Sequence, residues 1–448
     1  MGKRWIGEFL VVKEIRKKVA DFLKSYQMYY EDIDIEEHVQ IFLSEMEKGL
    51  TAEGSSLQMI PTYIEVCDRI PINEKVIAID AGGTNFRVAL VTFDKDRKPS
   101  IQRYKKVLMP GVKKEVSKET FFQTFVDYLG EIINESSKIG FCFSFPTEIF
   151  PNKDGRLIDF CKEIKAKEVI GELIGGNLLA AIKKSGYEKD KQVILLNDTV
   201  ATLLAGNAFS QKLIYDSYIG FILGTGSNCC YIESNRNILK KSNLEPTKSQ
   251  IINVESGSYG KGPMGDIDRK YDGTTSNPGL YTYEKMISGG YFGTLCLETL
   301  KIAAKDGLFS STTARNVLDL KEINIKDVDD YMTCPAGSNK VFNKIFHQAD
   351  EKDGATAYFI FDDLIERAAL LSAICLSAVV IKSCAGVNPC YPVCISAEGT
   401  TFYKFDSLKA RTESYLDYYL KKRINRYYQI VHIKNASLIG AAIAGLTN

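Results

Sequence analysis

Two apolar runs rich in β-branched residues flank a short polar stretch in VIAIDAGGTNFRVALVTF, residues 76–93. This pattern predicts a β-hairpin, with strands over 75–80 and 86–93 and a glycine turn between them. A similar stretch, YIGFILGTGSNCCYIE at 218–233, lies further along the chain. A chain with two such hairpins is expected to form two similar lobes that face each other across a cleft.

Both turns expose backbone N–H groups, which suit phosphate oxygens. Neither belongs to a familiar phosphate loop, because the chain has no G-x-x-x-x-G-K-[ST] and no helical pattern follows the first pair of glycines. An ordinary hairpin turn explains either one alone, whereas the pair favours a nucleotide triphosphate held between the lobes. The first tip consists of Gly82, Gly83, Thr84 and Asn85, and the second of Gly224, Thr225, Gly226 and Ser227.

A carboxylate, Asp80, adjoins the first tip. Because like charges repel, a carboxylate beside a phosphate needs a positive charge between the two. The usual solution is a Mg²⁺ ion or one of its waters. We therefore expect Asp80 to hold Mg²⁺ through water.

Strand-like and helical patterns alternate along most of the chain. This alternation predicts an α/β fold whose sheets are covered by helices on both faces. Residues 1–50 are expected to be helical, and 306–356 is a polar stretch. Further strands are expected at 101–108, 138–145, 192–196, 392–400 and 427–433, and helices at 118–134, 167–184, 199–208, 281–305, 359–383, 406–422 and 435–446.

The bulk composition of the 448 residues restricts the partners. With 57 basic and 56 acidic residues, the net charge of +1 gives no support to a nucleic-acid partner. The longest nearly apolar run, 368–381, is too short to span a bilayer and is expected to be a buried helix. Eleven scattered cysteines without a C-x-x-C pair predict reduced thiols and a cytoplasmic protein.

The stretch VILLNDTVATLLAG at 193–206 runs from an apolar strand through Asn197, Asp198 and Thr199 into a helix. An acidic residue or threonine here can simply cap the helix. Alternatively, Asp198 lies at the carboxyl end of a central strand, where open α/β sheets bind their ligands. A carboxylate in that place can accept a proton from an attacking hydroxyl, as phosphoryl transfer requires.

Three other places carry polar groups next to predicted strands or among glycines and aromatic residues. Ser144 ends the strand in IGFCFSFPTEIF, which Pro146 could terminate for purely structural reasons. Glu255 and Glu284 are either solvated surface acids or acceptors of paired hydrogen bonds from neighbouring sugar hydroxyls.

Taken in order, these stretches resemble the hexokinases of the yeast and animal type. The resemblance is collinear over nearly the whole chain and includes LQMIPTYI (57–64), INVESGSYG (252–260), NPGLYTYEKMISGGYFG (277–293), ERAALLSA (366–373) and AEGTTFYK (397–404). It implies a two-lobed α/β fold of the actin-like ATPase (ribonuclease-H-like) kind, with a sugar and ATP cleft between the lobes. The expected small lobe is 74–200 plus 435–448, and the expected large lobe is 1–73 plus 201–434.

The resemblance also implies a reaction, the ATP- and Mg²⁺-dependent phosphorylation of a hexose at its 6-hydroxyl. Glucose is the first candidate for the hexose, with a role in glycolysis. The protein is expected to be a monomer or a homodimer. Asp198 resembles the general base of this family, Asp80 the carboxylate that holds hydrated Mg²⁺, and Gly399 and Thr400 the contacts to adenosine. The residues that resemble sugar contacts are Ser144, Cys161, Lys162, Asn197, Asp198, Asn228, Glu255 and Glu284.

Some positions depart from the family pattern. Cys161 replaces a sugar-contacting threonine, and a thiol is a poor hydrogen-bond donor. Ser256 stands where the family has the tryptophan after the first sugar glutamate, and Asn435 and Ala436 stand where it has Asp-Gly. These changes leave open a different hexose, such as mannose, fructose or an N-acetylhexosamine. Two further classes of protein also stay open, a non-catalytic hexose sensor and an actin-like ATPase with a protein partner.

Overall fold

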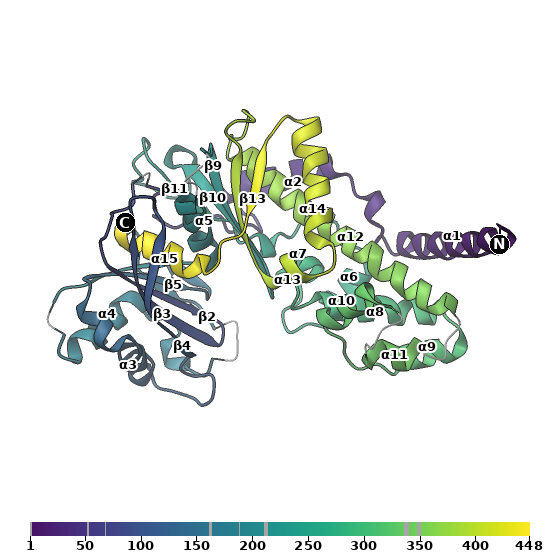
Figure 1. The fold of residues 1–448 in the computed structure, drawn as a ribbon, viewed down its shortest axis with the longest axis horizontal. Coiled ribbons are helices and arrows are strands. Elements are labelled where there is room, and N and C mark those ends of the chain that lie inside the picture. Colours follow the sequence, from purple (N-terminus) through teal and green to yellow (C-terminus); the bar gives the residue numbers. More distant parts are fainter. Residues whose placement is uncertain are drawn as a thin grey trace.

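Two mixed β-sheets form the framework of the computed structural model, which describes residues 2–51, 53–67, 69–160, 164–187, 189–209, 214–335, 340–346 and 351–448. The five-stranded sheet has the order β4-β3-β2-β5-β8, and the six-stranded sheet has the order β1-β11-β10-β9-β12-β13. Figure 1 shows helices on both sides of these sheets, so the predicted α/β fold with covered sheets is confirmed.

The five-stranded sheet begins with the first predicted hairpin, β2 (Val76–Gly82) and β3 (Asn85–Phe93). Antiparallel β4 extends it on one side, and parallel β5 and β8 extend it on the other. The three added strands are Pro99–Leu108, Lys138–Phe143 and Gln192–Leu196, close to the predicted ranges.

Alternate residues of β2 point to opposite faces of the sheet and pack into two separate hydrophobic cores. Ile77 and Ile79 pack with helices α3 (Lys118–Leu129) and α4 (Ile174–Lys184) on one face. Ala78 packs with the helices on the other face, α5 (Asp198–Phe209) and α15 (Ala436–Thr447). Because both faces are buried, the strand is apolar throughout except for Asp80, the one acidic residue within it.

The six-stranded sheet is built on the second predicted hairpin, β9 (Ser217–Leu223) and β10 (Ser227–Ser234). Strands β12 (Val393–Glu398) and β13 (Tyr428–Val431) run parallel to β9. Two strands on the other edge were not expected from the sequence, β11 (Ser249–Asn253) and the short β1 (Ile60–Pro61).

The 32-residue helix α12 (Glu351–Lys382) is the centre of the larger core and packs against α1, α2, α8 and α14. By length and composition α12 could cross a membrane, but 89% of its most apolar window is buried inside the structure. The polar stretch before it forms short helices. The remaining α-helices are α1 (Gly2–Ser25), α2 (Ile35–Leu50), α6 (Asp266–Asp272), α7 (Thr282–Ile287), α8 (Phe292–Lys305), α9 (Ser311–Leu318), α10 (Ile325–Thr333), α11 (Lys340–Phe346), α13 (Thr400–Lys404) and α14 (Leu408–Leu416).

Several predicted helices are shorter or interrupted. The helix predicted over 118–134 ends as an α-helix at Leu129, because Gly130 adopts a φ of +49°. The prediction over 281–305 is divided into α7 and α8, since the N–H groups of Gly289 and Gly290 bind the carbonyls of Gly224 and Thr225 instead of continuing the helix. The second glycine tip is thereby fixed to the α7–α8 turn.

The other corrections lie at helix ends. The helix predicted over 167–184 begins only at Ile174, after a single 3₁₀ turn at Lys167–Val169. The helix predicted over 406–422 starts at Leu408 and continues beyond Leu416 as a wider π-helical turn.

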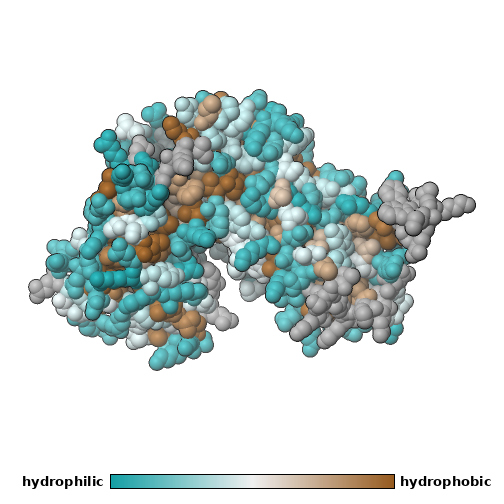
Figure 2. Space-filling view, in the orientation of Figure 1, coloured by the Kyte–Doolittle hydropathy of each residue, from teal (hydrophilic) through white to brown (hydrophobic). Residues whose placement is uncertain are grey.

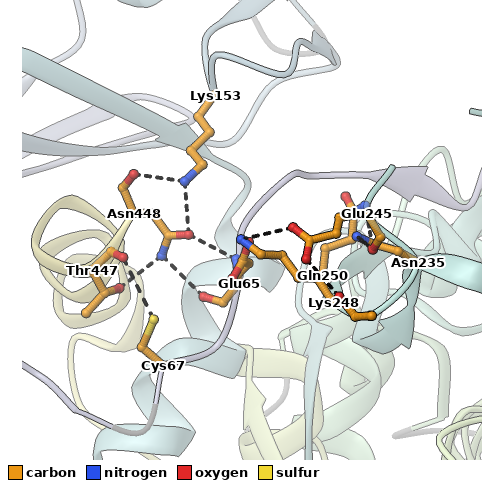
Figure 3. A network of polar contacts seen from close by, with 10 residues as sticks. Glu65, Cys67, Lys153, Asn235, Glu245, Lys248, Gln250, Thr447 and Asn448 are labelled. Carbon is orange, nitrogen blue, oxygen red and sulfur yellow. Dashed lines mark hydrogen bonds and ion pairs between the residues drawn. The ribbon is translucent and has the colours of Figure 1, made fainter. Parts of the chain in front are cut away.

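A network of polar contacts joins the parts of the chain that carry the two sheets (Figure 3). The side-chain amide of Asn448, after α15, accepts a hydrogen bond from the N–H of Glu65 at 2.9 Å and donates to its carbonyl at 3.2 Å. Lys153 donates to the Asn448 side chain, and Lys248 forms an ion pair with Glu65 at 3.0 Å. All strands of the five-stranded sheet lie within 74–200, and the exact lobe boundaries stay a prediction.

Candidate active site

A hollow opens between the five-stranded sheet and the helices around α7 and α13 (Figure 2; elements labelled in Figure 1). Most predicted site residues lie at the ends of strands or in the turns that follow them. Cys161 and Lys162 lie outside the described residues.

Asp198 is the first residue of α5, two positions after the end of β8. The helix is capped by Asn197, whose Oδ1 accepts a hydrogen bond from the N–H of Thr199 at 2.8 Å. The carbonyl of Asp198 accepts from Thr202 Oγ1 at 2.9 Å, and its carboxylate accepts from Thr199 Oγ1 at 3.3 Å. The capping role considered for Asp198 is therefore carried out by its neighbour.

Glu255 lies where β11 ends, in a left-handed conformation with φ +58° and ψ +49°. Its Oε1 accepts hydrogen bonds from Asn253 at 2.7 Å and from Asn228 at 3.1 Å. Burial raises the pKa of Glu255 to about 7, and the negative charges of Asp198 and Glu284 add to this increase. Glu255 and Glu284 come from the end of β11 and from α7, yet both bind the start of β10, since Asn228 donates to Glu255 and the adjacent Ser227 donates to Glu284.

Glu284 of α7 is joined directly to the second tip. Its Oε2 accepts a hydrogen bond from the N–H of Ser227 at 2.8 Å. A Cβ at Gly226 would lie 2.6 Å from the same oxygen, so only glycine leaves room for this carboxylate. The tip predicted to bind phosphate therefore also fixes a predicted sugar contact.

The first tip is a tight turn in which Gly82 pairs with Asn85. Gly83 has a φ of +64°, a value that glycine adopts at little cost. Asp80 is buried beneath this tip, where its Oδ2 accepts hydrogen bonds from Arg87 Nη1 at 3.0 Å and from Ser437 Oγ at 2.8 Å. Ser144 lies alongside, with Oγ 3.3 Å from the position that a Cβ of Gly82 would take.

The Cys142 thiol lies between the two aspartates, because β5 is the strand between β2 and β8. Its pKa is raised well above the ordinary value, mainly by burial and further by the charges of Asp80 and Asp198. The first tip and Asp198 thus belong to the same end of the five-stranded sheet, where β2, β5 and β8 have their carboxyl ends.

Gly399 and Thr400 follow β12 and lie against the second tip. Gly399 adopts a φ of +120°, and a Cβ there would lie 2.1 Å from the carbonyl oxygen of Leu223. The neighbouring Thr401 donates its hydroxyl to the carbonyl of Gly224 at 2.9 Å. The residues predicted to contact adenosine therefore adjoin one of the predicted phosphate tips.

The surroundings of Asp80 fit a hydrated magnesium ion better than a fully protein-coordinated metal. Among the described residues, no group of three or more His, Cys, Asp or Glu side chains could hold a metal. The hydrogen bonds from Arg87 and Ser437 both go to Oδ2 of Asp80, and its Oδ1 lies on the side of Gly82. Mg²⁺ keeps several waters and often binds through one or two carboxylates plus substrate phosphates, which this arrangement allows.

Comparison with known proteins identifies the family of the chain. One hexokinase family model matches residues 18–208, and a second matches residues 218–447. The chain belongs to the hexokinase family. The rat Hexokinase-2 (Rattus norvegicus) is 29% identical over 387 residues, which cover 81% of this chain and 41% of that protein.

Two other hexokinases are similar over shorter stretches. Hexokinase-5 of rice (Oryza sativa subsp. japonica) is 34% identical over 60% of this chain, and Hexokinase-1 of Schizosaccharomyces pombe is 32% identical over 62%. The matched regions cover 55% and 59% of those two proteins. The chain therefore spans about two fifths to three fifths of the length of these hexokinases.

Solved hexokinase structures share the fold. A hexokinase from Schistosoma mansoni, solved in complex with glucose, superposes with a TM-score of 0.77 at 23% identity and covers 98% of this chain and 100% of its own. A second hexokinase crystal structure gives a TM-score of 0.68 at 20% identity, with 97% of each chain covered. The two-lobed hexokinase fold predicted from the sequence is thereby confirmed.

The sequence interpretation missed three polar residues of the candidate site, namely Arg87, Ser437 and Asn253. Arg87 could have been found, because a two-residue turn at Gly83 and Thr84 places it directly opposite Asp80. Ser437 comes from α15 at the far end of the chain, and Asn253 lies on a strand that was not predicted. No local pattern indicates either of these two contacts.

We expect Gly226→Ala to raise the hexose KM by about ten- to a hundredfold, with a smaller effect on the KM for ATP. The added methyl group displaces Glu284 and breaks its hydrogen bond to Ser227, and a hydrogen bond to a charged group contributes about 1.5–3 kcal/mol. Initial-rate kinetics with each substrate varied in turn measures the effect. Gly224→Ala is the control, because its nearest neighbour would lie at 3.6 Å. An unchanged hexose KM in Gly226→Ala would remove Glu284 from the sugar site.

We expect Glu255→Gln to raise the melting temperature at pH 8 and to have little effect at pH 5. The pKa of Glu255 is about 7 in the folded protein, against about 4.3 in an unfolded chain. The folded state therefore binds more protons between these values, and stability is lost as the pH rises through this window. Thermal unfolding at both pH values measures the difference. The exposed Glu245→Gln serves as control, and a gain that does not depend on pH would contradict the expectation.

Proposed function

We propose that the chain transfers the γ-phosphoryl group of ATP to the 6-hydroxyl of a hexose, with glucose as the first candidate. The observation that carries this proposal is that two carboxylates bind adjacent residues of β10, since Asn228 donates to Glu255 and Ser227 donates to Glu284. The charge of Asp198 also acts on Glu255. Such a set of acceptors and donors suits a ligand with several neighbouring hydroxyls. An actin-like ATPase with a protein partner does not need it.

Different residues of the site are proposed to bind the sugar and the phosphates of ATP. Asn228, Glu255 and Glu284 orient the sugar, so that its 6-hydroxyl lies at Asp198. The Asp198 carboxylate takes the proton as the hydroxyl oxygen bonds to the γ-phosphorus, the bond to the bridging oxygen breaks, and ADP leaves. Backbone N–H groups of the two glycine tips stabilise the charge on the phosphoryl oxygens. Closure of the lobes excludes water, which would otherwise hydrolyse ATP.

Asp80 is the residue proposed to hold Mg²⁺. When bound, the ion neutralises charge on the phosphates and so lowers the cost of bringing the hydroxyl oxygen to the γ-phosphorus. Arg87 and Ser437 keep the Asp80 carboxylate in place through its Oδ2 atom. Cytoplasmic location, a role in glycolysis, and a monomeric or homodimeric state stay predictions.

A coupled assay of ADP release against a panel of hexoses tests the proposal. Glucose, mannose, fructose and N-acetylglucosamine should each be tried with ATP and Mg²⁺, and phosphorylation of at least one is the expected result. Direct sugar binding by calorimetry is measured in parallel. Binding without turnover would favour the non-catalytic hexose sensor, whereas neither binding nor turnover would overturn the proposed function.

A further inference from the structure

The buried side chain of Asn253, the last residue of β11, connects two predicted sugar contacts. Its Nδ2 donates a hydrogen bond to Glu255 Oε1 at 2.7 Å, and its Oδ1 accepts one from Asn228 Nδ2 at 2.8 Å. The residue is only 5% exposed, so water cannot easily replace these bonds. Both functional ends of this amide are thus directed at residues of the site.

The contacts around Asn228 leave one orientation for its amide. Asn228 Oδ1 accepts hydrogen bonds from the N–H groups of Cys229 at 2.7 Å and Ser256 at 3.3 Å. Its Nδ2 donates to Asn253 and to Glu255. If the Asn228 amide were turned over, its oxygen would face the oxygen of Asn253, which cannot donate, and its NH₂ group would face the N–H groups of Cys229 and Ser256. Asn253 is therefore one of the groups that determine which end of Asn228 faces Glu255.

Glu255 needs such a partner for two reasons. Its left-handed backbone conformation, with φ at +58°, is unfavourable for a residue with a side chain and persists only where the surroundings hold it. The charged groups that face it, Asp198 from α5 and Glu284 from α7, are both acids. The neighbouring Cys229 thiol on β10 is neutral, because burial raises its pKa. Hydrogen bonds from Asn253 and Asn228 are what favours the ionised carboxylate.

We propose that Asn253 is a positioning residue of the sugar site, which holds the Glu255 carboxylate and the Asn228 amide in the orientation that binds sugar hydroxyls. This inference rests on the proposed function for its consequence in catalysis, but the contacts that carry it do not involve a ligand. Asn253 acts through its two neighbours and need not contact the sugar itself.

The consequence is a change in the pH dependence of sugar binding. Without the Asn253 donor, the pKa of Glu255, already raised to about 7 by burial and the two acids, rises further. An increase of about one pH unit leaves roughly a tenth of the carboxylate ionised at pH 7 instead of about half. The hexose KM then rises about fivefold at pH 7 and hardly changes at pH 9, where both proteins are ionised.

The closing experiment reads the titration of Glu255 directly. The protein is labelled with ¹³C at the glutamate carboxyls, and Glu255→Gln identifies the signal. In Asn253→Leu the midpoint of this signal is expected to move upward by about one pH unit relative to the wild type. Asn253→Ser replaces the leucine variant if that variant does not fold. The serine hydroxyl is too short to reach Glu255, so the midpoint is expected to move in the same direction. An unmoved midpoint in either folded variant overturns the proposal.

A matched control exists on the same strand. Gln250 of β11 is 3% exposed and its amide is fully engaged, since it donates to Asn235 and accepts from the N–H of Tyr63, each at 2.8 Å. Gln250→Leu removes a buried amide without touching Glu255, so it should lower stability and leave the midpoint in place. A shift in this control equal to that of Asn253→Leu would show a general disturbance of β11 and overturn the proposal.

Hexose kinetics between pH 6 and 9 separates this inference from the proposed function. A KM ratio of Asn253→Leu to wild type that decreases from pH 7 to pH 9, with kcat changed less than KM, supports the positioning role. A ratio that is equal at all pH values contradicts it. If the wild type phosphorylates no hexose, the proposed function fails, whereas the carboxyl titration still decides whether Asn253 controls Glu255.

Discussion

We expect replacement of Asp198 by asparagine to lower kcat for the proposed hexose phosphorylation by about 10²–10⁴-fold and to leave the fold intact. The substitution keeps the shape of the side chain and removes its ability to take the proton of the 6-hydroxyl. Local structure is preserved, because Asn197 supplies the helix cap and Thr202 bonds to the backbone carbonyl of Asp198. Single-turnover kinetics and thermal unfolding of both proteins measure the two parts of the prediction.

The same substitution has a second expected effect, which concerns the hexose KM. Asp198 raises the pKa of Glu255, so removing its charge favours the ionised form of Glu255. The hexose KM should therefore not rise, and the loss should be confined to kcat. Asp127→Asn, on the exposed face of α3, is the control and should be fully active. An active Asp198→Asn enzyme would exclude Asp198 as the proton acceptor.

Gly140→Ala is expected to destabilise the protein by about 3 kcal/mol or more, an effect at the upper end of those measured for overpacking. Gly140 lies in the middle of β5, and a Cβ there would lie 1.7 Å from the carbonyl oxygen of Ala441 in α15. This neighbour is backbone, so it cannot rotate away, and α15 has to move off the sheet. Circular dichroism on heating should give a clearly lower melting temperature.

The displacement of α15 also affects the active site. The helix packs against β2, β5 and α5 and carries Ser437, which donates to Asp80. Activity should therefore fall below what the folded fraction of Gly140→Ala explains. Gly54→Ala is the matched control, because its added Cβ has no atom within 4 Å and its φ is not positive. Equal melting temperatures for the two variants would contradict the prediction.

Much of the five-stranded sheet could be predicted because its strands carry their own signals. Strands β2 and β3 are rich in β-branched residues and are joined by a glycine turn, and β8 leads directly into Asp198. Strand β11 was missed, since SQIIN is five residues long and has polar residues at both ends. Its identity as a strand depends on pairing with β10, the preceding strand, and with β1, which lies near the start of the chain.

The division of the helix predicted over 281–305 shows the same limit. Its apolar spacing is compatible with one helix, but the N–H groups of Gly289 and Gly290 bind the second tip, more than sixty residues earlier in the chain. Two tertiary hydrogen bonds thus outweigh the continuation of a helix at two glycines, which favour a helix less than any residue except proline. The local sequence shows the two glycines at which a helix can be interrupted, but it does not show the second tip that binds them.

The sequence by itself determined the two glycine-tipped hairpins, the family and the order of the polar residues, because turns, strand periodicity and collinear motifs are local properties. Only the tertiary structure decided how these residues are paired. It joined Asp80 to Ser437 and Glu284 to the second tip, and it put Asn253 between Asn228 and Glu255. The physical reason is that hydrogen bonds and charge interactions are stronger in the buried interior than in water. Folding brings segments that are far apart in the chain close enough to form them.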